Sequence, residues 1–145
     1  EESFIVRLFN VYGPGGHSVV NKFVKLIPSY KEVTVYGHGN QTRDYIYVDD
    51  VVNALLLGIE NSGTYNVGTG KDVSVIELIN MISEMTRSKA DIVFTEPVPG
   101  EIVRSKAVIE KIKSIWLPHT TLDEGVHKLL DLYGFDFSVL NKLPK

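Results

Sequence analysis

Gly37-His38-Gly39-Asn40-Gln41-Thr42-Arg43-Asp44-Tyr45-Ile46-Tyr47-Val48-Asp49-Asp50 is the most informative segment of this chain. Its pattern predicts a glycine-rich turn, then a strand with Arg43 near its start, then a helix opened by the two final acids. Glycine lets the backbone approach a ligand closely, and the planar guanidinium of arginine suits phosphate or carboxylate. A ligand-binding Arg43 and a surface Arg43 paired with Asp44 fit this spacing equally well.

Short apolar runs and helical patterns alternate on both sides of this segment. We expect strands at residues 4–9, 33–36, 44–48, within 63–70 and at 91–94, and helices at residues 19–27, 49–60, 74–86, 107–113 and 121–133. The strand at 4–9 should be buried, because it is an apolar, β-rich run. The helix at 49–60 should be central, because apolar residues occupy most of its faces. The alternation predicts an α/β fold.

Polar residues mark several element ends. Ser18 is placed to cap the helix that starts at Val19, and residues 74–77 and 121–124 are capping boxes. Residues 10–16 are rich in turn formers, and Asn10 stands where a strand ends, a place from which amides reach ligands. An amide that only shapes its own turn is the commoner case. The free N–H groups of the helix start near Val19 offer a ready anion site, but every helix start does so, and this signal alone is weak.

Composition limits the classes of function. The 145 residues are enough for one domain with a sizeable core, and the net charge of −3 leaves no basic excess for nucleic acid or an anionic membrane surface. The chain has no cysteine, which excludes disulfides and thiolate metal sites and fits a reducing compartment, so we expect a cytoplasmic protein. The four histidines show no metal-like spacing, and the longest apolar run, residues 54–57, cannot span a bilayer.

Five motifs occur in a familiar order. They are Arg7-Leu8-Phe9-Asn10-Val11-Tyr12-Gly13-Pro14, residues 35–51, Tyr65-Asn66-Val67-Gly68-Thr69-Gly70, Pro99-Gly100-Glu101-Ile102-Val103-Arg104-Ser105 and Thr121-Leu122-Asp123-Glu124-Gly125. This set closely resembles the C-terminal part of the NAD-dependent nucleotide-sugar epimerases and dehydratases, the extended short-chain dehydrogenases such as UDP-glucose 4-epimerase. The resemblance runs from about residue 4 to about residue 134.

The resemblance implies roles for individual residues. It implies that Asn10 contacts the sugar-diphosphate part of the substrate, and that the backbone near Val19 and Val20 meets the diphosphate at a helix start. It further implies that Val35 and Tyr36 line the nucleotide base. Arg43 and Arg104 would clamp the diphosphate. It also implies that Leu8 and Val11 lie near the nicotinamide of NAD, mainly through backbone and packing. The chain departs from the family pattern at two places. Val108 follows Ala107 where the family usually has Asp, so one common polar residue is absent. The segment between Pro14 and Val19 is short, which affects the shape of the sugar pocket.

The catalytic machinery of that family is not found in this sequence. None of the seven tyrosines has a lysine four residues later, and no glycine-rich loop fits a dinucleotide. A tyrosine acting as general acid and base needs a neighbouring cation to lower its pKa. We therefore name no catalytic and no metal-binding residue, and we expect the chain alone to be inactive.

These inferences give one expected organisation. Residues 1–134 would form a substrate-binding lobe plus the last strand or strands of a Rossmann-type parallel sheet, and residues 135–145 a tail. The expected partners are a nucleotide-diphosphate sugar, a missing N-terminal NAD-binding part and a second copy in a homodimer. A dehydratase fragment and a stand-alone nucleotide-sugar binding module are the alternatives, and a sequence upstream of Glu1 would discriminate between fragment and module.

Overall fold

The computed structural model of the chain describes residues 3–142. Strands and helices follow one another in the order β1 (Phe4–Leu8), β2 (Asn10–Tyr12), α1 (Val19–Leu26), β3 (Glu32–Tyr36), β4 (Thr42–Arg43), β5 (Tyr45–Tyr47), α2 (Val48–Leu56), η1 (Leu57–Ile59), β6 (Gly63–Val67), β7 (Val73–Ser74), α3 (Val75–Thr86), β8 (Asp91–Thr95), β9 (Arg104–Ser105), η2 (Ile112–Ser114), α4 (Leu122–Leu132) and η3 (Phe137–Lys142). The α/β class predicted from the alternating pattern is confirmed.

The sheets are small and mostly parallel. Strand β1 pairs with β6, β2 with β5, and β3 with β8, each pair parallel. Strand β4 lies between β7, to which it is antiparallel, and β9, to which it is parallel. Parallel pairs need a crossover connection, which here contains helices in each case. The arrangement is that of a partial Rossmann-like sheet attached to a second, more helical layer.

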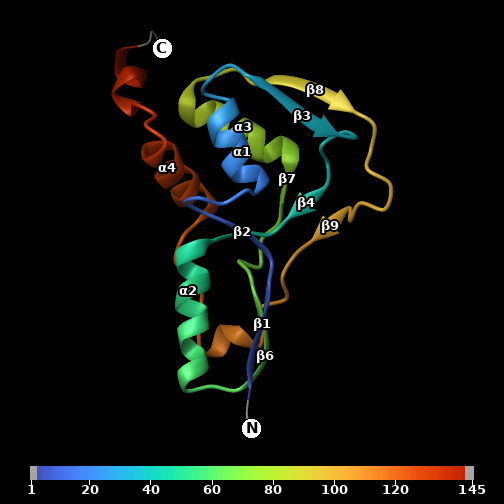
Figure 1. Ribbon diagram of the computed structural model, residues 1–145, viewed down its shortest axis with the longest axis vertical. Coiled ribbons are helices and arrows are strands. Elements are labelled where there is room, and N and C mark those ends of the chain that lie inside the picture. The colour runs from blue at the N-terminus through green and yellow to red at the C-terminus, as the bar shows by residue number, and fades with distance from the viewer. Residues whose placement is uncertain (1–2, 143–145) are drawn as a thin grey trace.

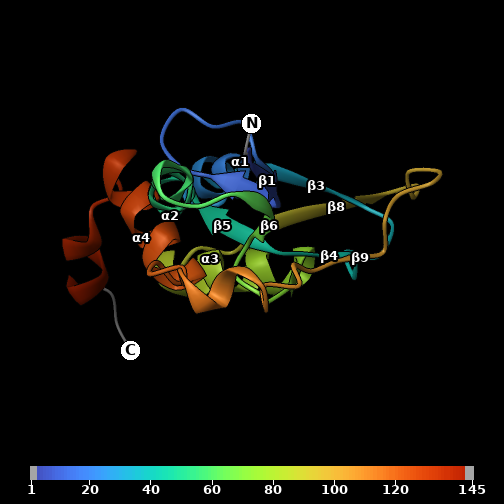
Figure 2. The same cartoon turned by 90° about the horizontal axis from the view of Figure 1, so that it is seen from below.

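One end of the molecule, which we call the helical lobe, contains α1, α3, α4 and the β3–β8 pair (Figure 1). The three helices pack on one another around a single apolar core. Figure 2 views the same lobe from below, with α4 and the C-terminal turn on the side away from the tips of β3 and β8. The predicted caps form: the Ser18 side chain accepts from Asn21 N, and both capping boxes are complete.

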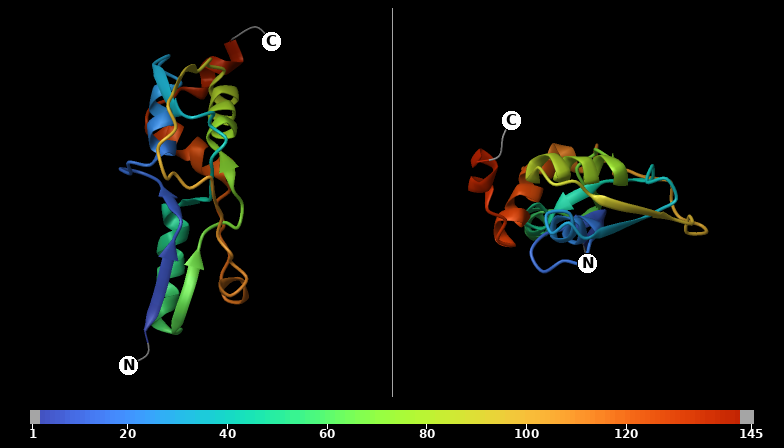
Figure 3. Two further views of the ribbon diagram at one scale, coloured as in Figure 1. Left: turned by 90° about the vertical axis from the view of Figure 1, so that its right-hand side faces the viewer. Right: turned by 90° about the horizontal axis from the view of Figure 1, so that it is seen from above.

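The opposite end, which we call the sheet end, contains β1, β6 and α2. Strands β1 and β6 run side by side with α2 along one of their faces (Figure 3). Val51 and Ala54 of α2 face this pair and belong to a second, smaller core. The other side of α2, continued by η1, carries an apolar row that is 46% to 82% exposed, consisting of Val52, Leu55, Leu56 and, in η1, Ile59. The prediction that this helix is central is therefore wrong for the chain as described, since only one of its two apolar faces is covered.

Three further expectations are corrected. The strand at 4–9 is half-exposed rather than buried, because within residues 3–142 only the side of β1 that carries Val6 packs on a core, and Ile5 and Leu8 are accessible. Part of the expected turn at 10–16 is strand β2, since Asn10–Tyr12 pairs with β5. The helix expected at 107–113 is reduced to the short 3-10 turn η2.

The last described residues are not a free polar tail. Phe135 and Phe137 pack against the core of the helical lobe, and the Phe137 ring stacks on His127 with 4.1 Å between centroids. Apolar residues following a helix gain free energy by covering its exposed side, which holds this segment against α4. Residues 143–145 of the expected tail lie outside the described range. Within residues 3–142, no helix has both the length and the apolar character that crossing a bilayer requires.

Candidate functional site

A groove of about 270 Å³ lies between the start of α1, strand β3 and the β4–β5 segment. Five of the residues predicted to bind substrate line it: Asn10, Val19, Val35, Tyr36 and Arg43. These positions are spread over more than thirty residues of sequence, and four different elements bring them together. The tertiary structure thus assembles most of the predicted site in one place.

The start of α1 forms one wall of the groove. Ser18 caps the helix and Val19 lines the groove, whereas the side chain of Val20 is fully buried in the core. The groove can therefore be reached by backbone N–H groups of the first turn but not by the Val20 side chain. Such a helix start carries a partial positive charge that favours anions. Lys22, one helical turn after Val19, adds a full positive charge to the same wall.

Arg43 lies on the opposite wall and is held by the protein. Its Nη1 donates to the carbonyl oxygens of Thr42 and Ile102, at 2.8 Å and 2.6 Å, and Nη2 lies 3.3 Å from Glu101 Oε1. The side chain is 18% exposed. A guanidinium has five N–H donors, so donors remain for a ligand in the groove. An incoming phosphate would share Arg43 with the Glu101 carboxylate, which also lines the groove.

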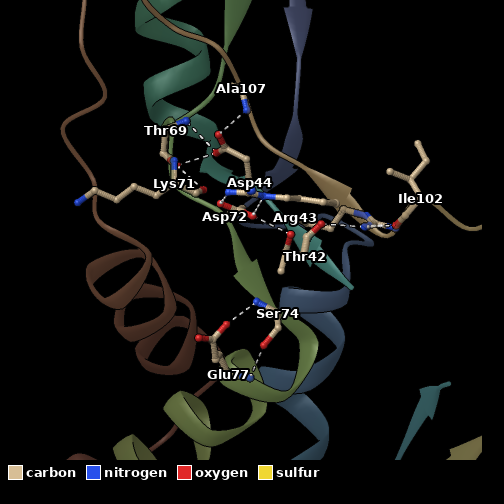
Figure 4. A network of polar contacts seen from close by, with 11 residues as sticks. Thr42, Arg43, Asp44, Thr69, Lys71, Asp72, Ser74, Glu77, Ile102 and Ala107 are labelled. Atoms are coloured by element: carbon tan, nitrogen blue, oxygen red, sulfur yellow. Dashed lines mark hydrogen bonds and ion pairs between the residues drawn. The ribbon is translucent and has the colours of Figure 1, made fainter. Parts of the chain in front are cut away.

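Asp44 does not pair with Arg43. Its carboxylate is fully buried and accepts hydrogen bonds from Thr69 N at 2.8 Å, Thr69 Oγ1 at 2.7 Å, Gly70 N at 2.9 Å and Ala107 N at 3.1 Å (Figure 4). The surface pair considered from the sequence is thus replaced by an anchor that joins three segments. This anchor fixes the strand from which Arg43 projects.

Arg104 does not reach the groove. Its guanidinium binds Asp72 through Nε, at 2.7 Å to Oδ2, and through Nη2, at 3.1 Å to Oδ1, and its side chain is 66% exposed. The hydroxyl of Thr42 donates to the same carboxylate at 2.7 Å. Strand register explains the separation: Arg104 pairs with Thr42, so both project from one face of the small sheet, while Arg43 projects from the other.

Leu8 and Val11, the expected neighbours of nicotinamide, also lie away from this groove. Leu8 is at the carboxyl end of β1 and is half-exposed, while Val11 is partly buried against the core of the sheet end. The glycine turn has a packing role in addition to any ligand role. A Cβ at Gly39 would lie 2.6 Å from Ile76 Cγ1, so the turn packs tightly on the start of α3.

Three further groove residues with polar or charged side chains had no predicted role in binding. They are Lys22, Tyr45 and Glu101. Lys22 could have been found from its position three residues after Val19 on the same helix face. Tyr45 could have been found from strand alternation, because it lies two residues after Arg43. Glu101 gave no comparable local signal, since a loop brings it to the groove.

Comparisons with known proteins agree with the predicted family. Residues 2–68 match the NAD dependent epimerase/dehydratase family. UDP-glucuronic acid decarboxylase 1 of Xenopus tropicalis is 31% identical over 137 residues, which cover 89% of this chain and 32% of that protein. The UDP-glucose 4-epimerase of Thermotoga maritima, solved with UDP-glucose, has a TM-score of 0.83 and 33% identity over 90% of this chain and 45% of its own.

The UDP-glucose 4-epimerase of Thermus thermophilus, solved in complex with NAD, has a TM-score of 0.82 and 30% identity over 90% of this chain and 46% of its own. The chain thus spans about a third to a half of the length of these relatives. The resemblance predicted from the five motifs is confirmed.

Proposed function

Because this chain is similar to the NAD-dependent epimerases and dehydratases over about 90% of its length, we propose that it belongs to that family and forms the nucleotide-sugar-binding part of such an enzyme. The whole protein would act as an epimerase similar to UDP-glucose 4-epimerase, with a nucleotide-sugar dehydratase as the alternative. The observation that carries the proposal is the groove, where a helix start, Arg43 and Asn10 converge beside an exposed aromatic ring, Tyr36.

The chemistry of the groove suits a nucleoside diphosphate. The first turn of α1, Lys22 and Arg43 supply positive charge on two sides, which fits the two phosphates. The half-exposed Tyr36 ring and the adjacent β3 backbone offer an apolar face and hydrogen-bonding groups, which fit a base. Binding energy from this remote part of the substrate positions the sugar for reaction elsewhere.

We propose that this chain binds and orients the substrate without moving a proton itself, because its sequence contains no Tyr-x-x-x-Lys pair. NAD, when bound, supplies the hydride acceptor and donor for epimerisation. Leu8 fits a place beside nicotinamide, since it is half-exposed at the carboxyl end of a parallel strand, where ligands of open α/β sheets bind. A role for Arg104 as a second diphosphate ligand would require β9 to move, because the Arg104 guanidinium is bound to Asp72.

We also propose that an NAD-binding part covers the sheet end. Strand β1 pairs only with β6 within the described residues, and the outer row of α2 is apolar and accessible. Parallel sheets are normally buried on both faces, so a lone parallel pair beside a half-covered helix is incomplete. A further parallel strand next to β1 would extend the sheet, and a second layer would cover the apolar row of α2.

Calorimetric titration of UDP into the full-length protein tests the binding proposal. Arg43→Ala should weaken UDP binding by about 1–3 kcal/mol, the usual loss for a hydrogen bond to a charged group. Lys89→Ala, which removes a positive charge from an exposed loop outside the groove, is the matched control and should leave UDP affinity unchanged. Equal UDP affinity in the wild-type and Arg43→Ala proteins would rule out the proposed site.

A further inference from the structure

The side chain of Tyr45 is buried with an unsatisfied hydroxyl. Tyr45 is 3% exposed, and its hydroxyl oxygen has no hydrogen-bond partner within the described residues. Buried polar groups in folded proteins nearly always have a partner, and leaving one without a partner destabilises the fold. A phenylalanine would fill the same space without that cost. The hydroxyl therefore needs an explanation other than stability.

The position of Tyr45 suggests which group could satisfy it. In the parallel β2–β5 pair, Asn10 is the partner of Tyr45, and partners in register project from the same face of the pair. Asn10, Arg43 and Tyr45 all line the groove described above. The hydroxyl is thus embedded in the wall of the site that holds the two polar residues proposed to contact a diphosphate.

The charge state of Tyr45 suits donation to an anion. Burial raises the pKa of Tyr45 to about 12, although the neighbouring Arg43 opposes the rise. The hydroxyl therefore keeps its proton at neutral pH and can donate a hydrogen bond. Residues 3–142 offer it no acceptor, while a phosphoryl oxygen is a strong one.

We propose that the Tyr45 hydroxyl donates a hydrogen bond to a phosphoryl oxygen of the nucleoside diphosphate in this groove, beside Asn10 and Arg43. This inference rests on the proposed function and assigns a specific donor to it. A second cavity, of about 300 Å³, also borders Tyr45, between the loop at residues 118–121 with the start of α4, the loop after β6, and α3. A water molecule in that cavity is the competing partner for the hydroxyl.

Tyr45→Phe in the full-length protein separates these explanations, because it removes only the hydroxyl. We expect UDP to bind about 10-fold more weakly or worse by calorimetry, as for other hydrogen bonds to charged groups. Uridine, which has no phosphate, should lose nothing. In the absence of ligand, the variant should unfold at the same temperature as the wild type or higher, because an unsatisfied buried group has been removed.

Tyr47→Phe is the matched control, since Tyr47 lies on the same strand and face but does not line the groove. It should leave UDP affinity unchanged. Unchanged UDP affinity in Tyr45→Phe, or a lower unfolding temperature without ligand, overturns the inference and indicates an internal partner such as water. If Arg43→Ala weakens UDP binding while Tyr45→Phe does not, the proposed function stands and only this inference fails. If neither change weakens binding, both fail.

Discussion

The helical lobe and the sheet end both consist of helices and strands, but they differ in how much of their apolar surface is buried. The core of the helical lobe contains sixteen buried residues from α1, α3, α4 and the strands between them, whereas the core of the sheet end contains six. The lobe covers the apolar faces of its helices with one another. At the sheet end, α2 keeps an accessible apolar row and β1 keeps an open edge.

This difference matches the two roles proposed for the chain, which are substrate binding in the helical lobe and contact with an NAD-binding part at the sheet end. The lobe supplies most of the groove walls, and its core residues Phe23, Val35 and Tyr45 also line the groove. The sheet end carries Leu8, at a strand end suited to a cofactor, and is left with surface that normally lies inside an α/β sheet. One chain thus joins a lobe with a large core of its own and a sheet that we propose is covered by a second part.

The largest expected effect tests the difference between the two cores. Leu129, in α4, is fully buried, while Leu55, in the outer row of α2, is 46% exposed. Leu129→Ala should lower the free energy of unfolding by about 2–5 kcal/mol, because it leaves a cavity. Leu55→Ala should change it by about 0.5 kcal/mol or less in this chain, as for other surface changes. Urea denaturation followed by circular dichroism measures both, and similar losses would contradict the comparison.

An intermediate effect is expected from a charge placed on the sheet end. Leu56→Lys puts a cation on the apolar row near the C-terminus of α2, where the helix dipole tolerates it. We expect less self-association of this chain, measured by light scattering, because an exposed apolar patch and an open strand edge favour pairing with other copies.

Leu132→Lys is the control for that experiment. Leu132 is an exposed residue at the C-terminal end of a helix, but it lies on the helical lobe. It should leave association unchanged. Equal effects of the two substitutions would show that the sheet end is not the associating surface.

The smallest effect concerns the ion pair behind the groove. The hydrogen bond from Arg104, followed by that from Thr42, lowers the pKa of Asp72 from 3.8 to about 2. Since the pKa is lower in the folded state, the charged Asp72 stabilises the fold above pH 3.8, and this contribution is lost as the pH falls towards 2. Asp72→Asn should flatten the pH dependence of the unfolding temperature in that range, and Arg104→Ala should do the same. A profile unchanged by both would contradict the assignment.

Local patterns in the sequence predicted much of the fold. Capping boxes, glycine turns and apolar spacing depend on residues within about one helical turn of each other, so the starts of α1, α3 and α4 could be read directly. The short helix expected at 107–113 failed, because its residues are held by contacts with β6 rather than by helical periodicity. For example, Asn66 Nδ2 donates to the Val108 carbonyl, and η2 packs on β6.

The sequence by itself determined the α/β class and the family motifs, and through the family resemblance it predicted Arg43 as a ligand-binding residue. The tertiary structure decided that Arg43 meets Asn10 and the start of α1 in one groove, that Arg104 projects from the opposite face, and that one apolar side of α2 remains accessible. The physical reason is the distance along the sequence between the residues that must meet. Side-chain spacing fixes which residues share a face of one element, but register between strands distant in sequence fixes which faces meet.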